Sequence, residues 1–413
     1  MTDKTHLQNL LLNLLSPSAS VTQDQLEALK EADWENMLVM VRQHRLAPLM
    51  HWQLSHAHPA LKVPERIALA LSTAFKNASF RSLTWQTALV RLHQLLDAAG
   101  IPYAALKGSY LAYHVYPHPA LRPMRDVDIV TPKEHVLEAY RVLQRGGLTR
   151  LDEYPGEPEA AMLVHKHLPP LKMPGAPIQV ELHARLLESP EGNSVSCDLS
   201  EEPGFWSRCV TGNIGTTPVR FEPTTDLLFH LIVHSVYEHQ LNNGPLLLSD
   251  MAYLVNTHEI DWPLFWRLAA DRQQTRGCVL ALMLTQRYWP LRHVAWGDAQ
   301  TMCDDLTDST LDATAALILR NTQARSSVAM NSRLQLAGGW SNKARVLASK
   351  LMPSRTRIAA TYPPTQRAWH LYAYYPAEWL RLFRVWREES KRVAPTDQHE
   401  EVRQMTSLSQ WLN

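Results

Sequence analysis

Leu106-Lys107-Gly108-Ser109 and Asp126-Val127-Asp128-Ile129-Val130 are the two stretches of this 413-residue chain that decide its fold. The first closes an apolar run of strand length, Pro102 to Leu106, with a turn that a helix can follow. The second alternates charged and apolar residues with the period of a strand. Together they predict a strand, a Gly-Ser turn and a second strand.

Outward from these stretches, the pattern predicts a small mixed sheet over residues 101–188. A helix is expected at Pro132–Gln144, where Gly146-Gly147 ends it. Further strands are expected after it, the last of which carries Glu181 between apolar neighbours. The expected strands are Leu148–Leu151, Ala161–His165, Leu168–Met173 and Ile178–His183.

Helical periodicity predominates on both sides of this unit. We expect an N-terminal helical region at 1–100, including a long helix that ends at Gly100, and a helical domain at 224–323. Residues 189–223 are predicted to form an irregular connector, and 324–413 an irregular stretch followed by basic aromatic helices. The predicted fold class is therefore α+β, a small mixed-sheet core flanked by N- and C-terminal helical segments.

The composition excludes several classes of protein. With 45% hydrophobic and 20% charged residues, the chain is neither disordered nor collagen-like. Lys and Arg total 41 against 40 Asp and Glu, which gives a net charge of +1. This charge is too small to indicate nucleic acid or a membrane surface as the partner. The four cysteines are scattered along the chain, and no apolar run reaches 18 residues. The N-terminus is interpreted as an amphipathic helix. These features favour a cytoplasmic location.

Three carboxylates are the candidates for chemistry. Residues i and i+2 of a strand face the same way, so Asp126 and Asp128 project together and repel unless a cation lies between them. Oxygen ligands of this kind select Mg²⁺ or Mn²⁺. Glu181 on a later strand could complete the site and deprotonate an incoming hydroxyl. The Gly108-Ser109 turn could present backbone N–H groups to phosphate oxygens.

In this order, the motifs resemble the nucleotidyltransferase superfamily with the DNA polymerase β-like fold. More closely, Leu106-Lys107-Gly108-Ser109, Leu121-Arg122-Pro123-Met124-Arg125-Asp126-Val127-Asp128 and Val180-Glu181-Leu182-His183 resemble the bacterial "uncharacterised nucleotidyltransferase" family. The motifs cover about residues 100–185, and the helical run from Asp226 to Asp250 resembles the family's second part.

The resemblance implies transfer of a nucleoside monophosphate from an NTP, with ATP expected, in a reaction that depends on Mg²⁺ or Mn²⁺. It implies a sugar, sugar-phosphate or peptide acceptor in cell-envelope or secondary-metabolite biosynthesis. It assigns Asp126, Asp128 and Glu181 to metal binding and catalysis. Residues assigned to nucleotide binding are Lys107, Gly108, Ser109, Arg122 and Arg125.

Several other side chains are candidates for substrate contact. His165 and His167 are expected on one strand face, and His183 shares the face of Glu181. His230 and His234 stand four residues apart on a helix with spacing that could bind zinc, although the glutamate base of a HExxH protease is missing. The alternative to a metal site is a polar group packed against the sheet unit, and Asp250 could belong to it. The Trp- and Arg-rich helix from Ala377 to Glu389 is interpreted as an amphipathic helix packed on the body, with nucleic-acid binding as the alternative.

Two other functions remain open at this stage. The same parts could position the γ-phosphorus of the NTP, which would make the protein a phosphotransferase. The chain could also be an inactive NTP- or partner-binding module, since a fold does not guarantee activity. The sequence does not name the acceptor, the NTP or the oligomeric state.

Overall fold

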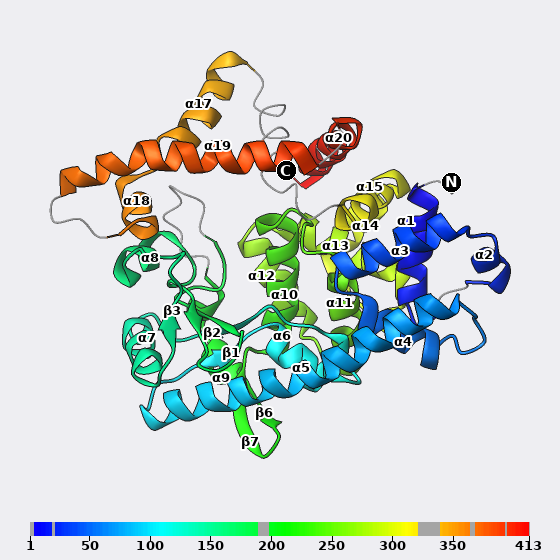
Figure 1. The fold of residues 1–413 in the computed structure, drawn as a ribbon, viewed down its shortest axis with the longest axis horizontal. Coiled ribbons are helices and arrows are strands. Elements are labelled where there is room, and N and C mark those ends of the chain that lie inside the picture. Colours follow the sequence, from blue (N-terminus) through cyan, green and yellow to red (C-terminus); the bar gives the residue numbers. More distant parts are fainter. Residues whose placement is uncertain are drawn as a thin grey trace.

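The structure is a computed structural model that describes residues 4–18, 21–188, 198–320, 339–363, 368–392 and 395–412. At its centre lies a seven-stranded mixed sheet in the order β3-β4-β5-β2-β1-β7-β6 (Figure 1). The strands are β1 (Ala104–Ala105), β2 (Asp126–Val130), β3 (Thr149–Arg150), β4 (Leu171–Lys172), β5 (Gln179–His183), β6 (Val210–Ile214) and β7 (Thr217–Phe221).

Strand β2 occupies the middle of the sheet and sets the register of its neighbours. It runs parallel to β5, with Asp128 opposite Glu181, and antiparallel to β1, with Ala105 opposite Ile129. On its far edge β1 runs parallel to β7, and β6 and β7 form an antiparallel hairpin. All residues of β2 except Asp126 are buried, as expected for a central strand covered on both faces.

Five helices precede the sheet: α1 (Lys4–Leu15), α2 (Gln23–Glu27), α3 (Glu31–Gln43), α4 (Ala47–His56) and α5 (Glu65–Ala98). The 34-residue helix α5 is about 50 Å long. It contacts α4 at one end and α7 and β7 at the other, so it ties the N-terminal helices to the sheet (Figure 1). Gly100 ends this helix in the left-handed conformation (φ +67°), where a side chain would be strained.

Around the sheet motifs lie three short helical elements. Helix α6 (Gly108–Tyr110) continues into a π-helical turn at Leu111–Val115 and follows β1 directly. Helices α7 (Val136–Arg145) and α8 (Pro158–Val164) lie on the side of the sheet away from helices α1 to α4 (Figure 1).

The chain after the sheet is helical. Helix α10 ends in a π-helical turn, His234–Glu238, and packs against α11, α12 and α13. The helices up to residue 320 are α9 (Phe205–Arg208), α10 (Thr224–Val233), α11 (Leu246–Thr257), α12 (Trp262–Asp271), α13 (Thr275–Tyr288), α14 (Gln300–Asp304) and α15 (Asp308–Ile318).

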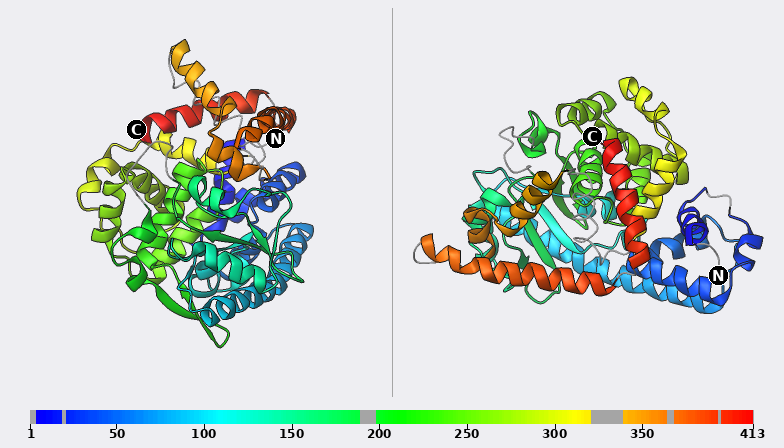
Figure 2. Two further views of the ribbon diagram at one scale, coloured as in Figure 1. Left: turned by 90° about the vertical axis from the view of Figure 1, so that its left-hand side faces the viewer. Right: turned by 90° about the horizontal axis from the view of Figure 1, so that it is seen from above.

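Four C-terminal helices complete the described chain: α17 (Trp340–Leu351), α18 (Arg355–Thr361), α19 (Tyr375–Arg392) and α20 (Pro395–Leu412). Figure 2 shows α17 and α19 on the outside of the molecule. Helix α20 packs against α15, and α18 packs against α8. The C-terminal part of the chain therefore returns to the sheet unit through α18.

The predicted α+β fold is confirmed, and so are most of the predicted elements within the described residues. The strand predicted at Asp126–Val130 has those bounds. The helix predicted at Pro132–Gln144 is α7, and the one predicted at Ala377–Glu389 is α19. The helices of the 224–323 region also lie where periodicity placed them. Part of the irregular stretch expected at the start of 324–413 lies outside the described residues.

Two predictions of local structure are wrong. The strand expected at Ala161–His165 is helix α8, which begins with Pro158 at its first position and runs through two alanines. An irregular connector is expected at 189–223, but the described part of it, from residue 198 onward, contains strands β6 and β7, which extend the sheet. Gly212, Asn213 and Pro218 lie within these strands, and such residues are depleted in strands, which obscured the pattern. Residues 189–197 lie outside the described chain.

No helix among the described residues is long and apolar enough to span a membrane.

Candidate active site

The three predicted carboxylates lie on one face of the sheet and line one cavity. Asp126 and Asp128 are two residues apart on β2, and the parallel register sets Glu181 on β5 beside Asp128. All three line a cavity of about 1080 Å³, which is large enough for a nucleotide and a second substrate. The structure therefore brings together the residues that the sequence separates by more than fifty positions.

Asp128 has two close partners. Its Oδ2 lies 3.3 Å from Lys107 Nζ, and its Oδ1 lies 3.0 Å from His183 Nε2. Burial opposes ionisation of Asp128, but the Lys107 ammonium and the His183 hydrogen bond outweigh it and hold the pKa well below its ordinary value. Asp128 is thus a charged carboxylate neutralised by a buried lysine.

Asp126 and Glu181 lie close to the carboxylate of Asp128. Burial, then the charges of Asp128 and Glu181, raise the pKa of Asp126 to about 7. Glu181 accepts a hydrogen bond from Gln179 Nε2 at 2.8 Å, and its Oε2 lies 3.7 Å from His167 Nε2. Three acids gathered in one buried corner call for a cation among them.

The donor set fits a divalent metal ion. One ligand atom each from Asp128, Glu181 and His183 lies within 4.8 Å of the others, and Asp126 lines the same cavity as Asp128 and Glu181. Carboxylate oxygens predominate in this set, which suits Mg²⁺ or Mn²⁺. Asp126, Asp128 and Glu181 can therefore hold a metal, with His183 in reach of the same position.

The turn that carries Lys107 is strained and is held by a residue that sequence reasoning missed. Lys107 has φ +45° and ψ −113°, a conformation that few side-chain-bearing residues adopt. Its backbone N–H donates to Glu222 Oε1 at 2.6 Å, and Glu222 Oε2 lies 2.9 Å from His230 Nδ1. Glu222 and His230 are both fully buried. Glu222 directly follows β7, whose sequence of Thr, Pro, Val, Arg and Phe gave no signal of a strand.

The pKa directions indicate that this buried pair is neutral. Burial raises the pKa of Glu222 to about 8, while burial and the charges of Lys107 and Lys166 hold the pKa of His230 well below its ordinary value. A protonated Glu222 can donate to His230 Nδ1 and accept from the Lys107 N–H. Lys107 and Asp128 are the charged groups that face Glu222, from α6 and β2, and His230 faces it from α10.

Replacing Glu222 by glutamine should therefore stabilise the protein at alkaline pH. The glutamine amide keeps both hydrogen bonds but cannot ionise. Since the folded-state pKa of Glu222 is raised, its ionisation costs stability as pH rises from 4.5 to about 8, by up to about 1.4 kcal/mol per pH unit. Urea unfolding across this window should show the advantage of the variant growing with pH.

The exposed Glu153 provides the control, because Glu153→Gln should show no such trend. A Glu222→Gln variant less stable than wild type at both ends of the window would mean that the carboxylate is charged in the folded protein.

Of the four other residues predicted to bind nucleotide, three line the cavity and one does not. Gly108, Arg122 and Arg125 line the same cavity as the carboxylates. Ser109 is 1% exposed, its hydroxyl has no hydrogen-bond partner within the described chain, and it is not among the residues that line this cavity. The phosphate contact predicted for Ser109 would thus have to come from elsewhere on the turn.

The predicted histidines separate into two groups. His167 and His234 line the cavity. His165, His183 and His230 do not: His165 ends α8, His183 lies under Asp128, and His230 pairs with Glu222. His165 and His167 do not share one strand face, because only His167 pairs with the sheet, opposite His183.

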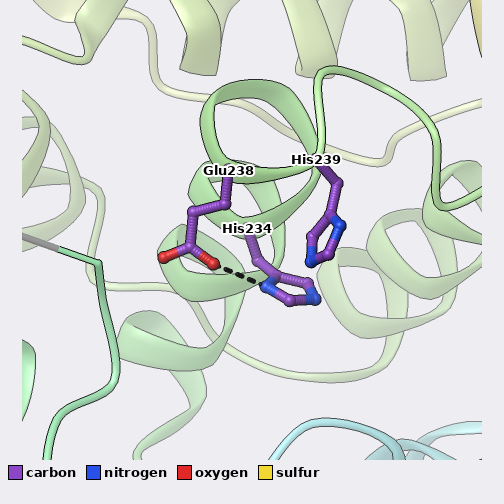
Figure 3. Close-up of side chains that lie close together, drawn as sticks. All are labelled: His234, Glu238 and His239. Atoms are coloured by element: carbon purple, nitrogen blue, oxygen red, sulfur yellow. Dashed lines mark hydrogen bonds and ion pairs between the residues drawn. The ribbon is translucent and has the colours of Figure 1, made fainter. Parts of the chain in front are cut away.

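His234 belongs to a polar group that the sequence did not reveal as a unit (Figure 3). Its Nδ1 lies 2.8 Å from Glu238 Oε2, and His239 packs edge-on against its ring. Lys166 Nζ donates to the same Glu238 oxygen at 2.6 Å. Burial opposes ionisation of Glu238, yet Lys166 holds its pKa below the ordinary value. Although His234, Glu238 and His239 could hold a metal, the Lys166 ammonium already neutralises this carboxylate.

Asp250 borders the cavity but is engaged by the protein. Its Oδ1 accepts hydrogen bonds from Arg122 Nε at 2.6 Å and from the Tyr116 hydroxyl at 2.7 Å. Asp250 therefore fixes the position of Arg122, one of the predicted nucleotide-binding residues. A further cavity residue, Arg45, comes from the N-terminal region and was not predicted.

Comparison with known proteins adds one match. A family model described as "Uncharacterised nucleotidyltransferase" matches residues 30–290, a span that includes helices α3 to α5, the sheet and helices α10 to α13. No curated protein and no solved structure matched the chain.

Proposed function

Because the chain belongs to the uncharacterised nucleotidyltransferase family, we propose that it transfers a nucleoside monophosphate from an NTP, with ATP expected, to an acceptor hydroxyl or phosphate. The observation that carries this proposal is the parallel pairing of β2 with β5, which sets Glu181 beside Asp128 at the cavity. As proposed, the reaction depends on Mg²⁺ or Mn²⁺. The acceptor is a sugar, sugar-phosphate or peptide in cell-envelope or secondary-metabolite biosynthesis.

Asp126, Asp128 and Glu181 would hold the metal ion. When bound, the metal would polarise phosphoryl oxygens and offset the negative charge of the triphosphate. Lys107, 8% exposed and paired with Asp128, adds a fixed positive charge at the same place.

Glu181 is the proposed proton acceptor. An acceptor oxygen attacks the α-phosphorus, the bond from this phosphorus to its bridging oxygen breaks, and pyrophosphate leaves. The proton of the acceptor hydroxyl passes to Glu181 Oε2, because Glu181 Oε1 already accepts from Gln179. Arg122, held by Asp250, and Arg125 would position the phosphates.

The other wall of the cavity supports a polar acceptor. It carries Lys166, His234 and Glu238, together with Arg272 and Arg357 from α12's end and α18. Hydrogen-bonding and charged groups of both signs suit the hydroxyl, phosphate or amide groups of sugars and peptides.

The test is product analysis after incubation with each NTP, Mg²⁺ and candidate acceptors. Pyrophosphate release together with a nucleotidylated acceptor would support the proposal. Release of a nucleoside diphosphate would establish phosphoryl transfer instead. If no acceptor gives either product and the protein binds no NTP, the remaining function is that of a partner-binding module.

Lys107→Met should link stability to divalent metal. The substitution leaves the buried Asp128 without its ammonium partner, which is expected to lower the free energy of unfolding by about 3 kcal/mol in EDTA. Mg²⁺ should restore part of this loss, because a cation can replace the ammonium beside the carboxylate. Denaturant unfolding with and without Mg²⁺ measures both.

Lys172→Met on the exposed face of β4 is the matched control and should respond to neither treatment. If Mg²⁺ stabilises Lys107→Met no more than wild type, the metal site does not include Asp128.

A further inference from the structure

A second cavity, of about 440 Å³, adjoins the catalytic one and is lined by five arginines. We call it the arginine cavity; its arginines are Arg42, Arg45, Arg81, Arg122 and Arg125. Arg45, Arg122 and Arg125 line both cavities, and Met124 lies with them in the shared wall. No aspartate or glutamate is among its lining residues. Since the whole chain has a net charge of only +1, this concentration of positive charge is local.

Four of the five arginines lack a carboxylate partner within the described chain. Arg122 pairs with Asp250, whereas the other four form no ion pair with any described residue. The guanidinium of Arg45 donates through NH1 to the Pro123 carbonyl at 3.1 Å, and its Nε is buried with no hydrogen-bond partner among the described residues. Burial, then the charges of Arg125 and Arg122, lower the pKa of Arg45 to about 9.

The backbone of Arg45 is also unusual. The residue follows the end of α3, where Leu46 N–H donates to Val41 O and Arg45 N–H donates to Arg42 O. This is the hydrogen-bond pattern of a helix terminus at which glycine is preferred, and Arg45 adopts the left-handed conformation there with φ +59°. Arg45 therefore occupies a backbone position that favours glycine, and its guanidinium lies near the like charges of Arg122 and Arg125 as well as near the carboxylates of Asp126 and Asp250.

We propose that the arginine cavity binds a multiply charged phosphate group, a diphosphate or triphosphate, beside the catalytic carboxylates. Arginine suits this ligand, because its planar guanidinium pairs with two phosphate oxygens at once and remains charged when partly buried. The bound anion supplies the missing partner of Arg45 Nε and relieves the repulsion among Arg45, Arg122 and Arg125. Trp85 and Tyr113 are the aromatic residues of the cavity wall.

Two sources could supply this phosphate group: the triphosphate of the NTP, whose leaving pyrophosphate would lie here, or a diphosphate on the acceptor. The inference rests on the proposed function only in that one substrate carries phosphate. It is therefore tested in EDTA with inorganic pyrophosphate, without nucleotide, acceptor or transfer.

Calorimetry should detect pyrophosphate binding to the wild-type protein, weakened about tenfold or more in Arg45→Gln/Arg81→Gln. Arg81 lines only the arginine cavity, so the single variant Arg81→Gln, which should also weaken pyrophosphate binding, separates this cavity from the catalytic one. Arg292→Gln, at an exposed arginine outside both cavities, should bind as wild type does. Arg45→Gly guards against a folding defect, because glycine suits the left-handed position; it should lose affinity without a lower thermal midpoint.

Comparison of ATP with AMP in Mg²⁺ identifies the source. If the NTP supplies the phosphates, Arg45→Gln/Arg81→Gln weakens ATP and spares AMP. If the acceptor supplies them, both nucleotides keep their affinity while pyrophosphate binding falls. Either result supports the proposal. Absence of pyrophosphate binding in wild type, or equal binding in the double variant, overturns it, whatever the outcome of the transfer assay.

Discussion

Asp126→Asn should leave the protein folded and reduce Mg²⁺-dependent ATP affinity by at least about a hundredfold. Asp126 lines the cavity, forms no ion pair with any described residue and lies near Asp128 and Glu181, whose charges raise its pKa. Its replacement thus removes a proposed metal ligand and also removes repulsion between neighbouring acids. The free energy of unfolding should be equal to that of wild type or higher.

The contrast with Asp128 makes this result diagnostic. Asp128→Asn also removes the partner of Lys107 and a contact of His183, so its effect on binding cannot be separated from its effect on folding. Calorimetry of ATP binding with Mg²⁺ and with EDTA, beside urea unfolding, measures both quantities for Asp126→Asn. Asp152→Asn, at an exposed aspartate outside the cavity, is the control. Unchanged Mg²⁺-dependent affinity in Asp126→Asn would exclude this residue as a ligand.

Glu181→Gln should lower kcat by roughly a hundredfold or more while nucleotide affinity changes little. A proton acceptor acts on the transition state, so its loss appears in kcat rather than in substrate binding. Glutamine keeps the size of the side chain and the acceptor oxygen for Gln179 Nε2. The fold around β5 should therefore be preserved.

The measurement is steady-state kinetics of pyrophosphate release with the identified acceptor, beside calorimetry of ATP binding. Glu153→Gln should retain wild-type values for both. A variant at Glu181 with more than about a tenth of wild-type kcat would assign this carboxylate to structure. A loss of affinity as large as the loss in kcat would make it chiefly a metal ligand.

The carboxylate cluster could be predicted from sequence because it depends on local periodicity. Asp126 and Asp128 share a face in any strand, and the order of strand, turn and strand that the family motif requires can be read along the chain. Only the register between β2 and β5, which makes Asp128 and Glu181 neighbours, had to come from the structure.

Glu222 and Arg45 could not be predicted, because their roles arise from long-range packing. Glu222 meets the Lys107 amide only because β7 pairs with β1 across a chain separation of more than a hundred residues. Its strand was obscured by residues that strands disfavour. Arg45 looks like an ordinary basic residue near the end of a helix. Its left-handed backbone and its like-charged neighbours appear only when the end of α3 packs beside Arg122 and Arg125.

The docking of α18 on α8 places part of the cavity border outside the span that the family model matches. Arg357 reaches the cavity from α18, which lies beyond the part of the chain that the family model matches. In Figure 1, α18 lies beside α8 and below α19. The close approach of Gly156 to the Ala360 carbonyl leaves no room there for a Cβ atom. The three carboxylates thus lie within the matched span, whereas one border of their cavity is formed by a segment outside it, so a change in α18 would reshape that border and leave the residues of β2 and β5 as they are.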